Sequence, residues 1–187
     1  MRPPFRRAAK VPADVLSRAG LGRADRVLAH TVAADGTWLL GTRSGLVVVR
    51  PASPLDEPAS PLVEPVETIP WEQVETADWD RDTERLRIAE VGDFGLPRPV
   101  HEFSLADPGR LLQLVRERVT ASVLLQRRVA LPGSRSGFVV VGRRSPHRDG
   151  EISWAVEYDV GVDPSDPAVA EAAAAGLRAA QDEVGSI

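Results

Sequence analysis

Residues 26–50 read RVLAHTVAADGTWLLGTRSGLVVVR, and this stretch decides the predicted fold. It opens with an apolar, partly alternating run that ends at Asp35-Gly36, a dipeptide typical of tight hairpin turns. Two more apolar runs follow, one on each side of the glycine-rich Gly41–Gly45 segment. Strand-forming runs separated by turn residues predict an antiparallel meander.

Further elements are expected on both sides of this meander. Residues 12–20 begin with Pro and end with Gly, the asymmetry of a short helix. Downstream, four more strands are predicted. They cover residues 67–69, 73–80, 84–91 and 101–105.

A helix is predicted after these strands. Asp107 is expected to cap it, with Pro108 as its first residue, and it should run to about Thr120. Its apolar residues have helical spacing. They are Leu111, Leu112, Val115 and Val119.

The remaining sequence predicts a strand, a hairpin and a final helix. Residues 122–131 favour a strand, and residues 136–143 and 152–160 favour a hairpin. The last helix is expected to start in the Asp163–Pro167 segment and to end near Val184, with Gly185 as its cap.

Six or seven antiparallel strands capped by one helix is the order of elements in a pleckstrin-homology-like (PH-like) barrel. Several segments of this chain resemble bacterial PH-like domains, and the resemblance is greatest to uncharacterised proteins of high-GC bacteria. The segments are RVLA at 26–29, GTWLL at 36–40, IPWEQV at 69–74, ADWD at 77–80, RLRI at 85–88 and WAVEYD at 154–159. The resemblance implies an α+β chain: a PH-like antiparallel β-barrel or sandwich capped by a helix, followed by a C-terminal β-hairpin plus helix extension.

Three regions follow from this prediction. Residues 1–23 form a basic N-terminal tail with a short helix, and residues 24–121 form the barrel and its capping helix. Within the barrel, the repeated PASPLDE and PASPLVE place a proline-rich inserted loop at 51–64, because proline removes ladder donors. Residues 122–187 form the strand-hairpin-helix extension, which is expected to pack on the barrel.

The composition excludes several chemistries. The chain has no Cys, and Lys10 is its only lysine, which removes thiol nucleophiles, Cys-type zinc sites and phosphate-loop lysines. No apolar run reaches the ~18–20 residues of a membrane span, and no apolar segment follows the N-terminal arginines as in a signal peptide. The expected location is cytoplasmic.

No motif predicts catalytic, cofactor-binding or metal-binding residues. His101-Glu102 begins the zincin pattern, but Leu105 stands where the second histidine is needed, so an edge-strand histidine is expected. The acidic run 78–84 lacks the glycine and the final glutamate of a calcium loop. The chain is therefore predicted not to be an enzyme. The alternative, an unrecognised active site, would need His30 or His101 beside an Asp in a pocket.

The predicted partner-binding residues lie in an arginine-rich strip and at one tryptophan. The strip, within residues 127–148, has no acidic residue. Its members are Arg127, Arg128, Arg135, Arg143, Arg144 and Arg148. They are expected either to pair with the acidic C-terminal hairpin and helix, or to contact nucleic acid or a protein partner. Tryptophans are expected in the core by default, but Trp71, just after Pro70, is predicted to be partly exposed.

The expected partners are an unidentified protein or a second copy of the chain. Nucleic acid is the alternative, but a net charge of −4 and 5% aromatic residues disfavour it. Lipid head groups are also disfavoured, because the resemblance implies cations around the first hairpin turn, where Asp35 stands instead. The predicted function is a non-enzymatic protein-binding or scaffold module without a cofactor.

One internal similarity remains open. GTRSGLVVV at 41–49 and GSRSGFVVV at 133–141 share a turn that contains Gly, Ser and Arg and is followed by a valine-rich strand. Convergent turn chemistry and an old duplication are the alternatives, and each turn also offers backbone amides and an Arg that could hold a small anion.

Overall fold

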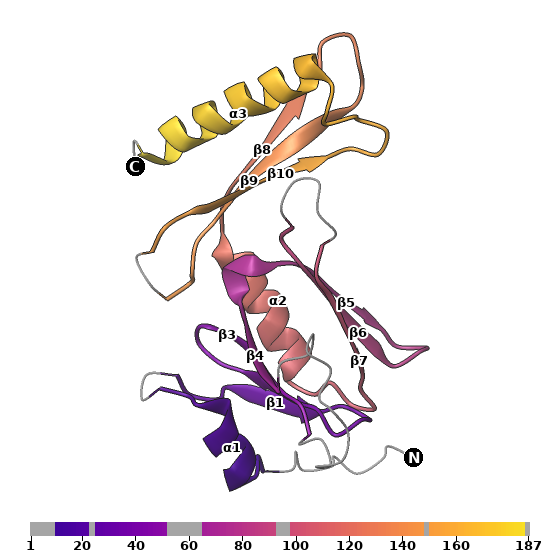
Figure 1. The fold of residues 1–187 in the computed structure, drawn as a ribbon, viewed down its shortest axis with the longest axis vertical. Helices are drawn as coiled ribbons and strands as arrows, with labels where there is room; N and C mark the ends of the chain where they lie inside the picture. Colours follow the sequence, from indigo (N-terminus) through magenta and orange to yellow (C-terminus); the bar gives the residue numbers. More distant parts are fainter. Residues whose placement is uncertain (1–9, 23–24, 52–64, 93–97, 148–149, 186–187) are drawn as a thin grey trace. The chain divides into compact units, whose positions relative to one another are not determined.

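The structure is a computed structural model that describes residues 10–22, 25–51, 65–92, 98–147 and 150–185 (Figure 1). The chain divides into two compact units, residues 1–119 and 120–187. Most of the predicted proline-rich loop, residues 52–64, lies outside the described residues, as do residues 1–9 of the N-terminal tail. The predicted packing of the C-terminal extension on the barrel stays a prediction.

The opening meander forms the first sheet of the first unit. Its strands are β1 (Ala29–Val32), β2 (Trp38–Gly41), β3 (Gly45–Val49) and β4 (Val66–Pro70), hydrogen-bonded antiparallel in that order. The Asp35-Gly36 turn closes on itself, because the Asp35 carboxylate accepts hydrogen bonds from the backbone N–H and the hydroxyl of Thr37. The predicted meander is confirmed.

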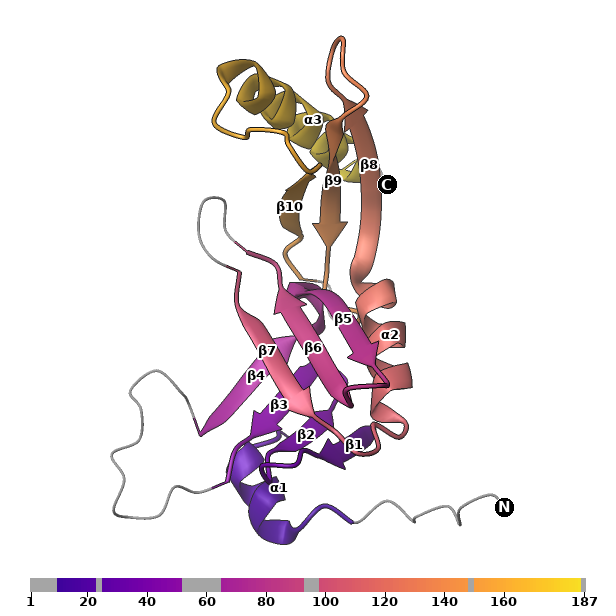
Figure 2. The same ribbon diagram turned by 90° about the vertical axis from the view of Figure 1, so that its right-hand side faces the viewer.

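A second antiparallel sheet follows a single turn of 3-10 helix, η1 (Trp71–Gln73). Its strands are β5 (Val74–Asp80), β6 (Arg85–Glu90) and β7 (Val100–Ser104), with β6 in the middle (Figure 2). These strands match the predicted ones within a few residues.

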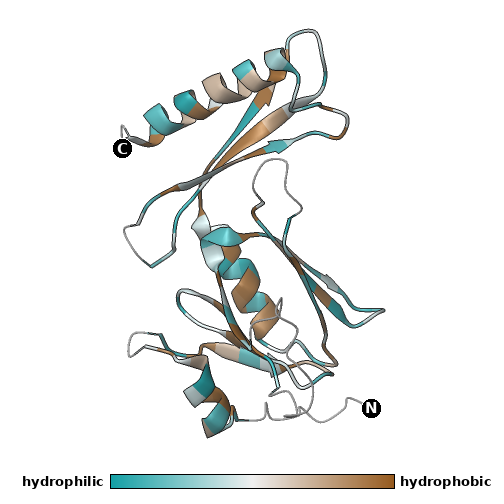
Figure 3. Cartoon of the chain, in the orientation of Figure 1, coloured by the Kyte–Doolittle hydropathy of each residue, from teal (hydrophilic) through white to brown (hydrophobic). Residues whose placement is uncertain are grey.

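The helices of the first unit are α1 (Ala13–Ala19) and α2 (Leu111–Ser122), of which residues 120–122 are assigned to the second unit. The predicted start of the second was wrong. The Asp107 carboxylate accepts the N–H of Gly109, whose φ of +50° is left-handed, so a turn occupies the place of the expected first helical residues. The apolar residues of α2 gather in its first half (Figure 3).

The main core of the first unit receives side chains from both sheets and from α2. Among its fully buried members are Leu46 of β3, Ile88 of β6 and Leu111 of α2. The predicted closed barrel is not formed by the described residues, because the ladder passes from β1 to β4 and separately from β5 to β7. Antiparallel sheets covering a common core with a helix are confirmed at the coarser level of α+β.

The second unit is a three-stranded sheet with a helix packed on one face. Strands β8 (Val123–Ala130), β9 (Gly137–Arg143) and β10 (Ser153–Tyr158) are antiparallel with β9 in the middle. Helix α3 (Pro167–Gly185) begins where the Asp166 carboxylate accepts the N–H of Ala168. Its buried Ala173 and Ala180 share a core with Phe138 of β9, so the predicted strand, hairpin and helix are confirmed.

The repeated glycine-valine segments have a common backbone requirement. Gly45 opens β3 and Gly137 opens β9, and both strands lie inside their sheets. A Cβ at Gly45 would come closer than 3.0 Å to the Ile69 carbonyl oxygen, and one at Gly137 would do the same to that of Val129. Only glycine lets the neighbouring strand approach so closely. Because both segments have this same requirement, independent convergence on similar turns is favoured over an old duplication.

Glu84, in the turn between β5 and β6, is a non-glycine residue with a left-handed φ of 52°. A residue with a Cβ is destabilised by about 1–2 kcal/mol in this conformation. Glycine avoids this cost, but its greater conformational entropy in the unfolded state offsets part of the gain. We expect Glu84→Gly to raise the free energy of unfolding by up to about 1 kcal/mol. Urea denaturation of the two proteins measures the difference, and a less stable variant would contradict the expectation.

Within the part of the chain that the structure describes, no helix is both long and apolar enough to cross a membrane.

Candidate functional site

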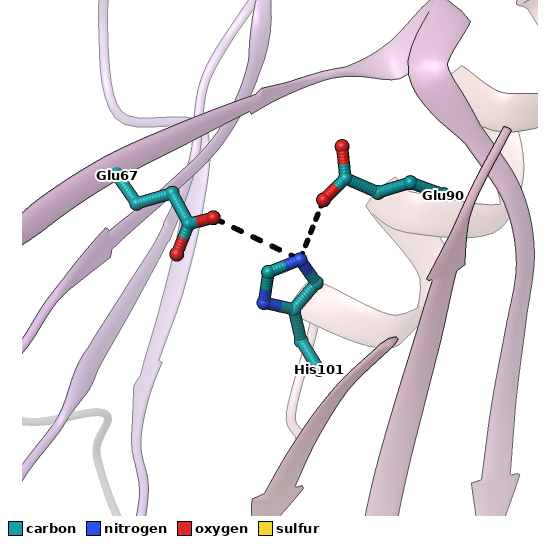
Figure 4. Close-up of side chains that lie close together, drawn as sticks. All are labelled: Glu67, Glu90 and His101. Carbon is teal, nitrogen blue, oxygen red and sulfur yellow. Dashed lines mark hydrogen bonds and ion pairs between the residues drawn. The ribbon is translucent and has the colours of Figure 1, made fainter. Parts of the chain in front are cut away.

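A histidine and two glutamates from three different strands converge in the first unit (Figure 4). Glu67 comes from β4, Glu90 from the end of β6 and His101 from β7. The cluster therefore joins the two sheets of this unit. We refer to these three residues as the Glu-Glu-His cluster.

Alternation along the strands explains why these polar side chains face one another. Successive strand residues point to opposite faces, so Glu67 shares a face with buried Ile69, Glu90 with buried Ile88, and His101 with Phe103. All three thus continue the inward-facing series of their strands beyond the apolar core.

The two glutamates approach the same ring nitrogen. Nε2 of His101 lies 2.6 Å from Oε1 of Glu90, a hydrogen bond, and 3.8 Å from Oε1 of Glu67. The side chains are 13% exposed for His101, 20% for Glu90 and 30% for Glu67, so the cluster is shielded but reachable from solvent.

Neighbouring groups hold two of the three side chains in place. The second carboxylate oxygen of Glu67, Oε2, accepts a hydrogen bond of 2.9 Å from Nη2 of Arg50, which leaves Oε1 facing His101. The His101 ring is stacked parallel to that of Phe103, with centroids 6.4 Å apart. Such outer contacts fix the orientation of a histidine and a carboxylate.

The cluster was missed by sequence reasoning. His101 lies on edge strand β7, as predicted, but the histidine alternative required an Asp beside it, and the structure places two glutamates there. Glu67 and Glu90 belong to no motif. The signal that could have found them is strand alternation, which puts each on the same face as a core isoleucine.

The predicted exposure of Trp71 was wrong. The side chain is fully buried in the first unit's main core, and its indole N–H donates a 3.2 Å hydrogen bond to the Thr42 carbonyl. The 3-10 turn directly after Pro70 turns this residue inward. Trp71 is therefore a core residue and not a contact surface.

The arginine strip is partly neutralised within the second unit, as one of the alternatives predicted. Arg127 forms an ion pair of 3.3 Å with Glu183 of α3, and Arg128 holds the Asp159 carboxylate through both of its terminal nitrogens. Both guanidinium groups remain about half exposed.

The other arginines of the strip lie in different environments. Arg143 is 5% exposed and donates to the Ser122 hydroxyl, whereas Arg135 is exposed in the β8–β9 turn and Arg144 is half-buried. Arg148 lies outside the described residues. Among the residues that the structure describes, the strip therefore does not form one continuous exposed surface.

The contact between Arg128 and Asp159 makes a pH-dependent prediction. Hydrogen bonds from Arg128 and from the Gly137 N–H lower the pKa of Asp159 below its ordinary value of 3.8. A carboxyl whose pKa is lowered by folding stabilises the fold above its unfolded pKa and loses this contribution as the pH falls through its folded pKa. We expect Asp159→Asn to be less stable than the parent at pH 7 and the difference to be smaller at pH 2. Denaturation at both pH values measures it, and an equal difference at both would contradict it.

The acidic run after β5 serves a local structural role. Oδ1 of Asp80 accepts hydrogen bonds from the backbone N–H groups of Asp82 and Thr83 and thereby forms the turn. A hydrogen bond from the Thr83 side chain, together with these two backbone bonds, lowers the pKa of Asp80.

A hollow of about 500 Å³ lies in the second unit, between the β8–β9 turn and the start of α3. Its lining includes none of the predicted site residues. It is formed by Leu131, Pro132, Ser134, Asp166, Ala168, Val169, Glu171 and Ala172.

Comparisons of the chain with protein-family models, with curated proteins and with solved structures find no match.

Proposed function

We propose that this chain is a non-enzymatic protein-binding module, that its first unit has a PH-like fold, and that edge strand β5 binds an extended, basic segment of a partner. The observation that carries the proposal is the position of β5. Among the described residues, it is hydrogen-bonded to a strand on one side only, that of β6.

The order of elements supports the PH-like assignment. A four-stranded and a three-stranded antiparallel sheet are followed by α2, whose Leu111 and Val115 are buried in the core that both sheets share. This is the order implied by the sequence resemblance, seven strands and then a helix. PH-like domains commonly hold peptides at an open edge, an analogy from fold alone.

Partly exposed apolar side chains lie on β5 and on α2. The main core of the first unit has four partly exposed members, and they come from β5 and α2. They are Ala77, Trp79, Leu112 and Val119. A partner strand added to β5 would form main-chain hydrogen bonds and could cover Trp79, an aromatic anchor of the kind that contributes most to binding energy.

The charge on the strand selects the partner. The face of β5 opposite the core carries exposed Thr76, Asp78 and Asp80. Asp80 is engaged in the turn, and Glu75, the third acidic residue of β5, is paired with Arg98, which leaves Asp78 as the exposed acidic group in the middle of the strand. Lysine or arginine on the partner would complement it, and like charges would be repelled.

The test is peptide selection against the full chain. A library of random peptides of about 10 residues, the length of a long strand, should yield binders in which Arg or Lys alternates with β-branched residues. Asp78→Lys should weaken the best binder at least about tenfold, a loss of about 1.4 kcal/mol. The matched control is Glu171→Lys, an exposed charge reversal on α3 that should leave binding unchanged.

Either of two outcomes would overturn the proposal. Binders whose affinity responds equally to both charge reversals would show a nonspecific electrostatic interaction. Binders that lose affinity on Arg135→Glu but not on Asp78→Lys would place the interaction on the arginine strip instead.

A further inference from the structure

We propose that the Glu-Glu-His cluster binds a divalent transition-metal ion of the zinc class, through Nε2 of His101 and one carboxylate oxygen each of Glu67 and Glu90. This site is separate from the proposed peptide-binding edge, because its ligands come from β4, β6 and β7, and β5 contributes none.

The donor set selects the class of metal. One imidazole nitrogen and two carboxylate oxygens suit Zn²⁺ and similar ions, whereas Ca²⁺ and Mg²⁺ take all-oxygen sites. Three protein ligands also leave a coordination position for water, as in the zinc sites that keep one place open.

The distances fit a site that needs only small adjustments to hold an ion. The three donor atoms lie within 4.8 Å of one another. A zinc ion about 2.0–2.2 Å from each ligand requires donor atoms about 3–4 Å apart. The 3.8 Å between His101 and Glu67 already satisfies this, and the 2.6 Å between His101 and Glu90 would lengthen as the ion replaces the shared proton.

The cluster has support of the kind that metal ligands need. Arg50 holds Oε2 of Glu67 and so directs Oε1 toward His101, and the backbone of each ligand is fixed within a strand. An ion bound there would connect the first sheet to the second. Its binding free energy would therefore stabilise this unit, by an amount that grows with the ratio of free metal to Kd.

Calorimetric titration of the full chain with Zn²⁺ tests the proposal. We expect one Zn²⁺ per chain, together with a rise in Tm. Glu90→Gln should weaken binding at least about tenfold while retaining the shape of the side chain, and His101→Ala should weaken it at least as much. The matched control is His30→Ala, which removes a half-buried histidine of β1 in the same unit and should leave the affinity unchanged.

Cobalt provides a readout that does not depend on stability. Co²⁺ added to the parent should produce visible absorption bands that Zn²⁺ displaces and that Glu90→Gln lacks. The proposal is overturned if the parent releases no heat with Zn²⁺, if the affinity survives both cluster substitutions, or if Ca²⁺ binds as tightly as Zn²⁺. If the parent chain binds zinc but selects no peptide, the proposed function alone is refuted. If it selects a peptide but binds no zinc, the metal site alone is refuted.

Discussion

Trp71→Ala is expected to lower the free energy of unfolding by about 3–5 kcal/mol, the cost of removing a large, fully buried aromatic side chain. Trp71 is completely buried at the turn that joins the two sheets of the first unit, and its N–H satisfies the Thr42 carbonyl. Its loss would leave a cavity and also an unpaired buried acceptor. Since domains are typically stable by only about 5–15 kcal/mol, this loss would remove a large share of the stability of the first unit.

Chemical denaturation of the parent and the variant measures this effect. Trp71→Phe is the matched control, because it retains most of the apolar volume and removes the hydrogen bond, so its loss should be clearly smaller. A Trp71→Ala protein as stable as the parent would mean that the side chain is exposed, as the sequence suggested.

Gly137→Ala is expected to have the second largest effect and to act on the second unit. The added methyl group would collide with the carbonyl oxygen of Val129, and backbone cannot move aside as a flexible side chain can. Because Gly137 is paired with Ala130, the first rungs of the β8–β9 ladder would have to separate. A loss of about 3 kcal/mol, the upper part of the range for overpacking, is expected.

Gly185→Ala is the matched control in the same unit, because a Cβ there meets nothing within 4 Å. Its stability should stay within about 0.5 kcal/mol of the parent. Hydrogen exchange of amides in β8 and β9 would locate the damage caused by Gly137→Ala. Unchanged protection there would contradict the explanation of the repeated glycine-valine segments.

The strands and their order could be predicted because each strand carries its own signal. Runs of Val, Leu and Ile bounded by turn residues, such as Gly36 and Gly133, have one favourable local structure, and burial on the sheets reinforces it. The start of α2 could not be predicted this way, because Asp107 is equally suited to cap a helix or a turn. In the folded chain Asp107 caps the turn, in which Gly109 takes a positive φ.

Strand alternation could have shown that Glu67 and Glu90 face inward, but it could not show that they meet His101, because the three residues are far apart in the sequence and meet only where two sheets share a core. Spacing motifs, such as the zincin pattern that His101-Glu102 begins, detect only ligands that lie within one element. Trp71 shows the converse difficulty. A proline before a tryptophan indicates a bend in the chain, but the side of the bend that faces the core depends on strands that lie elsewhere in the sequence.

The charge pattern of the arginine strip was informative in one respect. Its arginines were expected to pair with the acidic C-terminal hairpin and helix, and Arg127 and Arg128 do pair with Glu183 of α3 and with Asp159, which follows β10. Exposed pairs of this kind contribute little stability each. They reduce the net positive charge of the strip, however, which favours Asp78 on β5 over the arginines as the charged group of the proposed binding surface.

Amide hydrogen exchange of the full chain, with and without a selected basic peptide, tests the central claim most directly. If the peptide adds a strand to β5, alternate amides of Val74–Asp80 should become slower to exchange, since their N–H groups point away from β6 and would be hydrogen-bonded only in the complex. Amides of edge strands β1 and β10 should be unaffected. Protection confined to β8 and β9, with β5 unchanged, would contradict the account.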